Sequence, residues 1–291
     1  MSPQSAMSLM NVVEFALWAV LAFLFWKKKL NGRFPAMGMY LALRLISTPA
    51  LLGAYWVYSQ PWGRNYFPVY FFGFWGNYIA SAVILFLICM EVFRSALSSL
   101  PGLLKFGLVI FRWAVLVSVI VTLSTITFAN RGLLILPDVG IALMRSVSLL
   151  ELCLLAFLCL CMNALRLSVR DLAFGISLGF GVMSANDFIF ASLTARLASL
   201  TAPLQFVYES VILLSLGTWV AYCALPEPVR KPMMLPVNST IYRWNEIASA
   251  LGHTGTQVAV QQPANSFFLT DVEKVVDKVL NRSLKKRQSE L

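Results

Sequence analysis

The chain has 291 residues, a formal net charge of +10, 59% hydrophobic residues and only 12% charged residues. Soluble domains carry about 25% charged residues, and a soluble chain of this composition would expose large apolar patches. The composition therefore excludes an ordinary soluble protein and predicts a protein whose solvent is lipid. We read the positive charge as cytoplasmic loop charge, and we expect no nucleic-acid binding, which needs a soluble basic surface.

Seven apolar stretches are long enough to cross a bilayer, whose hydrocarbon core of about 30 Å needs about 20 helical residues. In chain order they are Ser8–Trp26, Pro35–Tyr58, Val69–Phe93, Phe106–Ala129, Val139–Leu165, Leu172–Ala195 and Pro203–Leu225. Turn-forming pairs such as Pro101-Gly102 and Pro137-Asp138 separate them. We predict an all-α integral membrane protein in which residues 1–225 form a seven-helix transmembrane domain.

The Lys and Arg residues between these stretches predict the orientation. With the N-terminus outside, the cytoplasmic loops carry eight basic residues and the external loops carry three. The eight are Lys27, Lys28, Lys29, Arg33, Arg94, Lys105, Arg166 and Arg170, and the three are Arg64, Arg131 and Arg196. The positive-inside rule then predicts an external N-terminus and a cytoplasmic C-terminus. We expect a multi-pass protein of a bacterial cytoplasmic (inner) membrane.

Residues 226–291 are predicted to form a short, basic cytoplasmic tail. The tail begins with a Pro-rich linker, which favours an extended exit from the membrane. Thr270-Asp271-Val272-Glu273 has the spacing of a capping box and opens an amphipathic helix over about 270–285. Such a basic helix suits a membrane surface or a groove on a cytoplasmic partner protein. A helix folded beneath the bundle is the alternative.

Ionisable side chains inside membrane spans are costly, and they are functional candidates by default. Four carboxylates, one guanidinium and one amide fall in the predicted outer half of the spans. They are Glu14, Asn77, Arg145, Glu151, Asp187 and Glu209. One guanidinium cannot neutralise four carboxylates, so some of these must be protonated, hydrated or matched by a cation. We predict an outward-facing polar cavity that binds a ligand through these six residues.

A structural alternative assigns the same residues to helix packing. In that reading Arg145 pairs with Asp187 or Glu151, while Glu14 and Glu209 reach the membrane interface. For Asp187 with Arg145 we favour a buried ion pair, because both side chains lie well inside their spans.

Three further charges, Arg44, Glu91 and Arg112, fall in the predicted inner half. We expect Arg44 to extend to the cytoplasmic interface and Glu91 to pair with Arg112 between the third and fourth spans. Gly175-x-x-x-Gly179 makes the sixth span a close-packing surface, which we interpret as a face for oligomer formation.

An internal repeat is a further hypothesis. Phe86–Arg94 aligns without a gap with Leu158–Arg166, sharing a Cys-Met pair and a final Arg. Duplication and coincidence are both open, because apolar segments align easily by chance.

The sequence contains no evident catalytic, cofactor or metal motif. It has a single histidine, His253, five cysteines within apolar runs, and no Walker A, G-x-S-x-G or His-Glu-x-x-His sequence. The seventh span has no lysine that could form a retinal Schiff base. We therefore expect no enzyme activity, no cofactor and no metal site.

Three functions remain. The first is a sensory or signalling-type seven-helix protein that acts through a cytoplasmic partner. The alternatives are a small-solute or ion transporter, which the intramembrane carboxylates support, and a structural or assembly subunit of a membrane complex. A cavity open only outward and reaching Asp187 favours a sensor, and one reaching the midplane behind a thin gate favours a transporter. The absence of a cavity favours a subunit.

Overall fold

The computed structural model describes residues 3–60, 63–98, 100–124, 135–162, 168–196, 201–225, 243 and 245–247. Within these ranges lie seven long helices and two short 3-10 turns, η1 (Leu30–Gly32) and η2 (Gly63–Tyr66). The helices are α1 (Pro3–Lys27), α2 (Pro35–Ser59), α3 (Phe67–Ala96), α4 (Pro101–Ser124), α5 (Ile135–Cys161), α6 (Leu172–Arg196) and α7 (Thr201–Ala224). All seven are long and apolar enough to span a membrane, which confirms the predicted fold class. The tail helix expected at about 270–285 lies outside the described residues.

Five of the described helices, α1, α3, α4, α5 and α7, begin earlier than the sequence predicted, and for α4 and α5 this changes the role of a proline. Helix α4 starts at Pro101 and α5 at Ile135, so the pairs Pro101-Gly102 and Pro137-Asp138 belong to first helical turns. Proline is tolerated there because the first N–H groups of a helix have no intrahelical partner. Reading these pairs as loop turns was therefore wrong.

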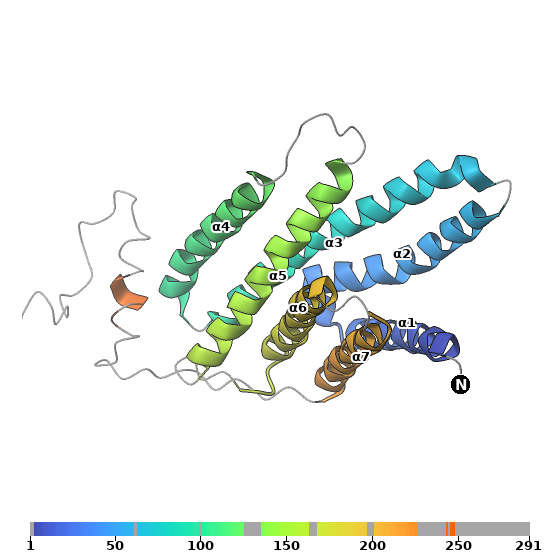
Figure 1. Cartoon of the computed structure of the whole chain (residues 1–291). Coiled ribbons are helices and arrows are strands. Elements are labelled where there is room, and N and C mark those ends of the chain that lie inside the picture. The colour runs from blue at the N-terminus through green and yellow to red at the C-terminus, as the bar shows by residue number, and fades with distance from the viewer. Residues whose placement is uncertain are drawn as a thin grey trace, which may run out of the picture. The chain divides into compact units, whose positions relative to one another are not determined.

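Six of the seven helices form a closed ring in the order α1, α2, α3, α5, α6 and α7, with α7 returning to α1. Helix α4 stands outside this ring, and of the other described helices it packs on α3 and α5 (Figure 1). The aligned segments of α3 and α5 are followed by α4 and α6, respectively. Because α4 lies outside the ring and α6 within it, these two helices do not occupy equivalent positions. This arrangement gives the duplication hypothesis no support.

The buried core lies at one end of the ring, where α1, α3, α5 and α7 end; we call this the core end. Its largest fully buried side chains include Leu21, Phe25, Phe34, Met37, Leu41, Ile88, Leu158, Leu216 and Trp219. Among the described side chains, none of α2 after Leu41 and none of α7 before Ser215 is buried. The helices therefore pack tightly at the core end and separate toward the opposite end, the open end. By the predicted orientation the open end is external.

Helix α6 packs closely against α7 because two of its glycines leave room for aromatic rings. Gly175 lies against Tyr222 and Gly179 against Trp219, and a Cβ atom at either glycine would overlap the ring. The Trp219 indole N–H also donates to the carbonyl of Gly175 at 3.1 Å. The close packing predicted from the Gly-x-x-x-Gly spacing is present, but the partner is α7 of the same chain. The oligomer interpretation of this face is corrected accordingly.

Side chains from distant parts of the chain satisfy the ends of several helices. Lys28 Nζ donates to the carbonyl of Ala224 at the end of α7, at 2.8 Å. Both carboxylate oxygens of Glu91 accept the backbone N–H of Ala36 in the first turn of α2, at 3.2 Å. The expected pair of Glu91 with Arg112 is thus corrected, since Glu91 caps α2 and Arg112 is exposed on α4. Carboxylates are favourable at helix N-termini because the free N–H groups and the helix dipole attract negative charge.

Helix α4 is capped by a residue of the tail. Asn245 Oδ1 accepts the backbone N–H groups of Gly102 and Leu103 at 3.0 and 3.2 Å. These are N–H groups of the first turn, which have no partner within the helix. The tail segment around Asn245 is thereby attached to the one helix outside the ring.

The contact between α6 and α7 predicts a sharp difference between two glycine substitutions. Gly179→Ala should lower the free energy of unfolding by roughly 1–3 kcal/mol, because the added methyl group must displace the Trp219 indole. Gly217→Ala is the matched control, since a Cβ atom there meets nothing within 4 Å. Unfolding of the full-length protein in detergent checks both variants. Equal stability of the two would contradict the proposed packing.

The cap on α4 predicts a local effect. Asn245→Ala should destabilise the first turn of α4 by about 1 kcal/mol, the usual loss when a helix-capping side chain is removed. Hydrogen exchange at Gly102 and Leu103 should then be faster than in the wild type. Glu246→Ala, at the exposed neighbouring position, should leave this exchange unchanged.

Candidate functional site

A pocket of about 360 Å³ lies inside the six-helix ring. Every ring helix contributes to its lining, whereas α4 does not. The lining residues follow helical spacing, such as Glu14 and Trp18 on α1, and Ser184, Asp187 and Ala191 on α6. Residues three or four positions apart share one face of a helix, which explains why these side chains converge.

The depth of the pocket is indicated by the exposure of its lining. Trp18, Tyr40, Leu85 and Phe180 are each at most 5% exposed and lie toward the core end. Ile141, Arg145, Asp187 and Ala191 are exposed and lie toward the open end. The pocket therefore opens where the helices separate and closes above the core.

Four aromatic rings close the pocket toward the core end. Trp18 packs on Tyr40 and on Trp219 with ring centroids 5.8 and 5.9 Å apart. Phe180 packs on Tyr40 at 5.6 Å and on Trp219 at 4.5 Å. These rings come from α1, α2, α6 and α7, so this aromatic floor ties together one side of the ring.

Arg44 stands over the aromatic floor, which corrects its expected place at the cytoplasmic interface. Its Nε donates to the Tyr40 hydroxyl oxygen at 3.1 Å, and its guanidinium lies 5.4 and 5.7 Å from the ring centres of Tyr40 and Trp18. Arg44 is nine residues beyond the start of α2, about 14 Å along the axis, which is near the middle of a bilayer. Cation–π contacts are stronger away from water, so a pocket position suits this side chain.

Two carboxylates, Glu14 on α1 and Asp187 on α6, line the pocket together with Arg44. Glu14 accepts a hydrogen bond from the Trp18 indole N–H at 3.1 Å, and Asp187 accepts one from the Tyr208 hydroxyl at 2.8 Å. Both carboxylates interact electrostatically with Arg44. The guanidinium therefore offsets negative charge contributed by α1 and α6.

Asp187 also belongs to a contact that joins α6 to α7. Besides the Tyr208–Asp187 hydrogen bond, Asn186 Nδ2 donates to the Tyr208 carbonyl at 3.1 Å. The ring of Phe190 packs on Tyr208 at 4.7 Å. Tyr208 is therefore held to α6 through its backbone, its ring and its hydroxyl group.

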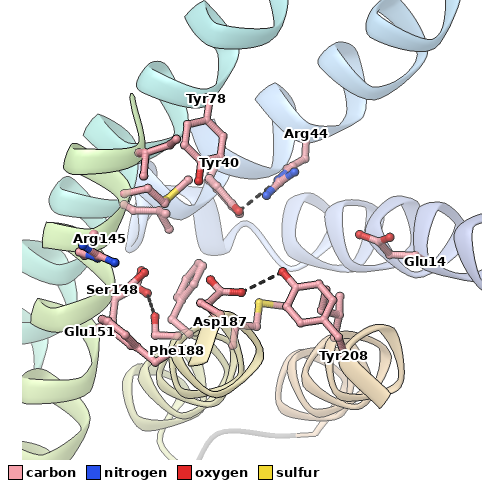
Figure 2. A pocket seen from close by; sticks show the side chains of 18 of the residues that line it. Glu14, Tyr40, Arg44, Tyr78, Arg145, Ser148, Glu151, Asp187, Phe188 and Tyr208 are labelled. Atoms are coloured by element: carbon pink, nitrogen blue, oxygen red, sulfur yellow. Dashed lines mark hydrogen bonds between the residues drawn. The ribbon is translucent and has the colours of Figure 1, made fainter. Parts of the chain in front are cut away.

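Glu151 is the most buried of the charged side chains that line the pocket. It is 5% exposed, and one of its oxygens, Oε2, accepts a hydrogen bond from the Ser184 hydroxyl. The other oxygen, Oε1, is buried and has no hydrogen-bond partner among the described residues. On α5, Arg145, Ser148 and Glu151 follow one another at three-residue intervals and all line the pocket. Figure 2 places these three side chains on the side of the pocket opposite Glu14.

Four of the six predicted ligand-binding residues, Glu14, Arg145, Glu151 and Asp187, line this pocket. The remaining two, Asn77 and Glu209, are not part of its lining. The predicted Asp187–Arg145 ion pair is absent from the described residues, where Asp187 instead accepts the Tyr208 hydroxyl. Whether the four lining residues bind a ligand stays a prediction.

The sequence reasoning missed several lining residues with uncharged polar or aromatic side chains. They are Trp18, Tyr40, Tyr78, Ser148, Ser184 and Tyr208. A usable signal existed, because Trp18, Ser148 and Ser184 each lie three or four residues from a predicted site carboxylate on the same helix. Tyr40 bears the same relation to Arg44.

The lining holds three carboxylates and two guanidinium groups, so carboxylates are in excess by one. Among the described residues, no three His, Cys, Asp or Glu side chains gather in a way that could hold a metal ion. The lining thus combines charged groups with an aromatic floor, which is the mixture of polar and apolar surface typical of small-molecule sites.

Comparison of the chain with protein-family models, curated proteins and solved structures finds no match. The functional argument therefore depends on the geometry of the pocket.

The contact between α6 and α7 predicts the outcome of a double-mutant cycle. Asp187→Asn and Tyr208→Phe should be coupled by about 0.5–2 kcal/mol in the free energy of unfolding, because they remove the same hydrogen bond. Unfolding of the four proteins in detergent measures the coupling.

The matched control pairs Asp187→Asn with Arg145→Gln. These changes should be additive within about 0.5 kcal/mol, because the two side chains make no direct contact in the structure. A large coupling in the control cycle, with none between Asp187 and Tyr208, would restore the predicted ion pair.

Proposed function

We propose that this chain is a sensor-type membrane protein that binds a small organic molecule in the ring pocket and signals through its cytoplasmic tail. The observation that carries the proposal is a polar pocket that opens at one end of the bundle and reaches Asp187 and Glu151. Its volume of about 360 Å³ falls in the lower part of the usual range for small-molecule sites.

The packing below the pocket favours binding over passage. A molecule leaving the pocket toward the core end would have to cross the aromatic floor and then the fully buried residues beneath it, such as Leu21, Phe25 and Leu216. Protein interiors are close-packed, so a path through these layers requires the helices to separate. Several layers of buried side chains therefore close the pocket at the core end. We expect such a closed end in a receptor site, whereas a transporter needs a thin gate there.

The position of α7 offers a route from the pocket to the tail. Tyr208 and Ile212 of α7 line the pocket, and the same helix ends where Lys28 caps it and the tail begins. A ligand that binds one arrangement of α6 and α7 more tightly than another shifts the population between them. The Tyr208–Asp187 contact is the natural element for such a shift, because it lies in the pocket wall and joins the two helices.

Transport of a small solute is a second candidate, and the depth of Glu151 favours it. This residue lies sixteen positions after the start of α5, about 24 Å along a helix of about 40 Å. The pocket thus reaches past the middle of α5, as transporter sites near the bilayer midplane do. The two candidates differ in whether the pocket ever opens at the core end.

Cysteine accessibility distinguishes them. Ala191→Cys, at an exposed position of the pocket lining, should react with a membrane-impermeant maleimide applied from outside intact cells. The wild type measures the background from the native cysteines, and Ala173→Cys, which is 1% exposed in the core, should stay unreactive from either side.

In inverted vesicles the sensor proposal expects Ala191→Cys to be protected from the same reagent. Reaction from both sides, together with reaction of Ala173→Cys from the inner side, would support alternating access and overturn the sensor in favour of the transporter. Reaction of Ala191→Cys from the inner side alone would contradict the predicted orientation.

A further inference from the structure

We propose that the ring pocket recognises a small organic ammonium group, which donates an N–H hydrogen bond to Glu151 Oε1 while the rest of the molecule rests on the aromatic floor. This inference rests on the proposed function in one respect, that the pocket is a ligand site. It adds the chemical class of the ligand.

The unpartnered oxygen of Glu151 is the first argument. Glu151 is 5% exposed and aimed into the pocket, and its Oε1 has no hydrogen-bond partner among the described residues. A buried acceptor without a donor is destabilising, and a buried carboxylate even more so. A ligand that supplies an N–H donor with a positive charge removes both costs at once.

The second argument is that the cations of the lining do not fill this role. Arg44 is hydrogen-bonded to Tyr40 and stands over the floor, where it interacts with Glu14 and Asp187. Arg145 is exposed toward the open end and makes no ion pair with Glu151 in the described part of the chain. Glu151 is thus the carboxylate of the lining that is both buried and left with an open acceptor.

The charge of the lining points the same way. When all three carboxyl groups are ionised they outnumber the two guanidinium groups, so a monocation neutralises the pocket, whereas an anion increases the imbalance. A neutral alcohol can occupy the acceptor at Oε1 but leaves the excess charge in place. The electrostatics therefore favour an ammonium over a carboxylate or a hydroxyl group.

The floor supplies the remaining recognition. Tyr40 and Phe180 of the aromatic floor line the pocket together with Met183, and they give it an apolar surface beside its charged residues. Aromatic rings attract both apolar groups and the polarised C–H and N–H groups beside an ammonium nitrogen. Ser148, one turn before Glu151 on the same wall, offers a hydroxyl oxygen as a second acceptor for the ammonium.

Four molecules that share a phenylethyl skeleton and differ in their polar groups test the proposal. They are 2-phenylethylamine (a cation), phenylalanine (a zwitterion), 2-phenylethanol (neutral) and 3-phenylpropionate (an anion). Binding to the full-length protein in nanodiscs is measured by calorimetry and by the shift of the unfolding temperature. We expect 2-phenylethylamine, the monocation, to bind at least tenfold more tightly than the alcohol, and the propionate to show no binding. Phenylalanine should bind between the amine and the alcohol, because it has the ammonium group but no net charge.

Glu151→Gln should weaken binding of the ammonium compounds at least tenfold, because the amide removes the charge and keeps the shape. Glu209→Gln is the matched control, a carboxylate of the same bundle outside the pocket lining, and it should bind as the wild type does. If Glu151→Gln fails to fold, Glu151→Asp takes its place. It should keep the preference for ammonium over alcohol with weaker binding.

Equal binding of the amine and the alcohol to the wild type would overturn the ammonium proposal. So would ammonium binding that is unchanged in Glu151→Gln, or a wild type that binds none of the four molecules. None of these results affects the one-sided accessibility of Ala191→Cys, so failure here is distinguishable from failure of the proposed function. Tighter binding of phenylalanine than of the amine, lost in Glu151→Gln, would support the proposal and assign the carboxylate group to Arg145.

Discussion

The packing of Trp219 against Gly179, and of Tyr222 against Gly175, is the contact on which the rest of this structure depends. It brings α7 close to α6 at the core end, where the indole N–H finds carbonyl acceptors on α6. In a membrane the hydrophobic effect does not drive helices together, so small residues and interhelical hydrogen bonds must do so. The ring is therefore joined at one end, and its helices diverge toward the other. The pocket is the space that this divergence leaves.

The membrane also limits where the polar groups of the pocket can lie. A charged side chain within a bilayer is tolerated where it faces other polar groups, and Arg44 meets this condition through Tyr40, Glu14 and Asp187. Asp187 meets it through Tyr208. Glu151 meets it only in part, through Ser184. Three buried side-chain atoms lack a hydrogen-bond partner among the described residues, and Glu151 Oε1 is the one that belongs to the pocket lining; we assign this atom to the ligand.

The sequence predicted the fold well because its strongest signal, the length of apolar runs, is set directly by the thickness of the bilayer. Helix starts were less predictable, since Pro101 and Pro137 are compatible with either a turn or a first helical turn. The sequence predicted the carboxylates of the candidate site, but it did not predict the side chains that form hydrogen bonds with them. Charges stand out in an apolar sequence, whereas Tyr40 and Tyr208 look like ordinary membrane aromatics until the rotation of each helix is known. Arg44 was misplaced for the same reason, because depth along a helix does not reveal which face a residue occupies.

Helix α4 differs from the six ring helices because much of its surface is not covered by the rest of the described structure. Many of its apolar side chains are exposed, including Trp113, Val117 and Ile120, and none of its described residues lines the pocket. The tilt of a helix with few protein neighbours is governed largely by the match between its apolar length and the thickness of the surrounding bilayer. Asn245 is hydrogen-bonded to the first turn of this helix, so a change in its tilt would move the acceptor's two donors. The residues around Asn245 therefore depend for their attachment on the helix of the bundle that lies outside the pocket-forming ring, among the residues that the structure describes.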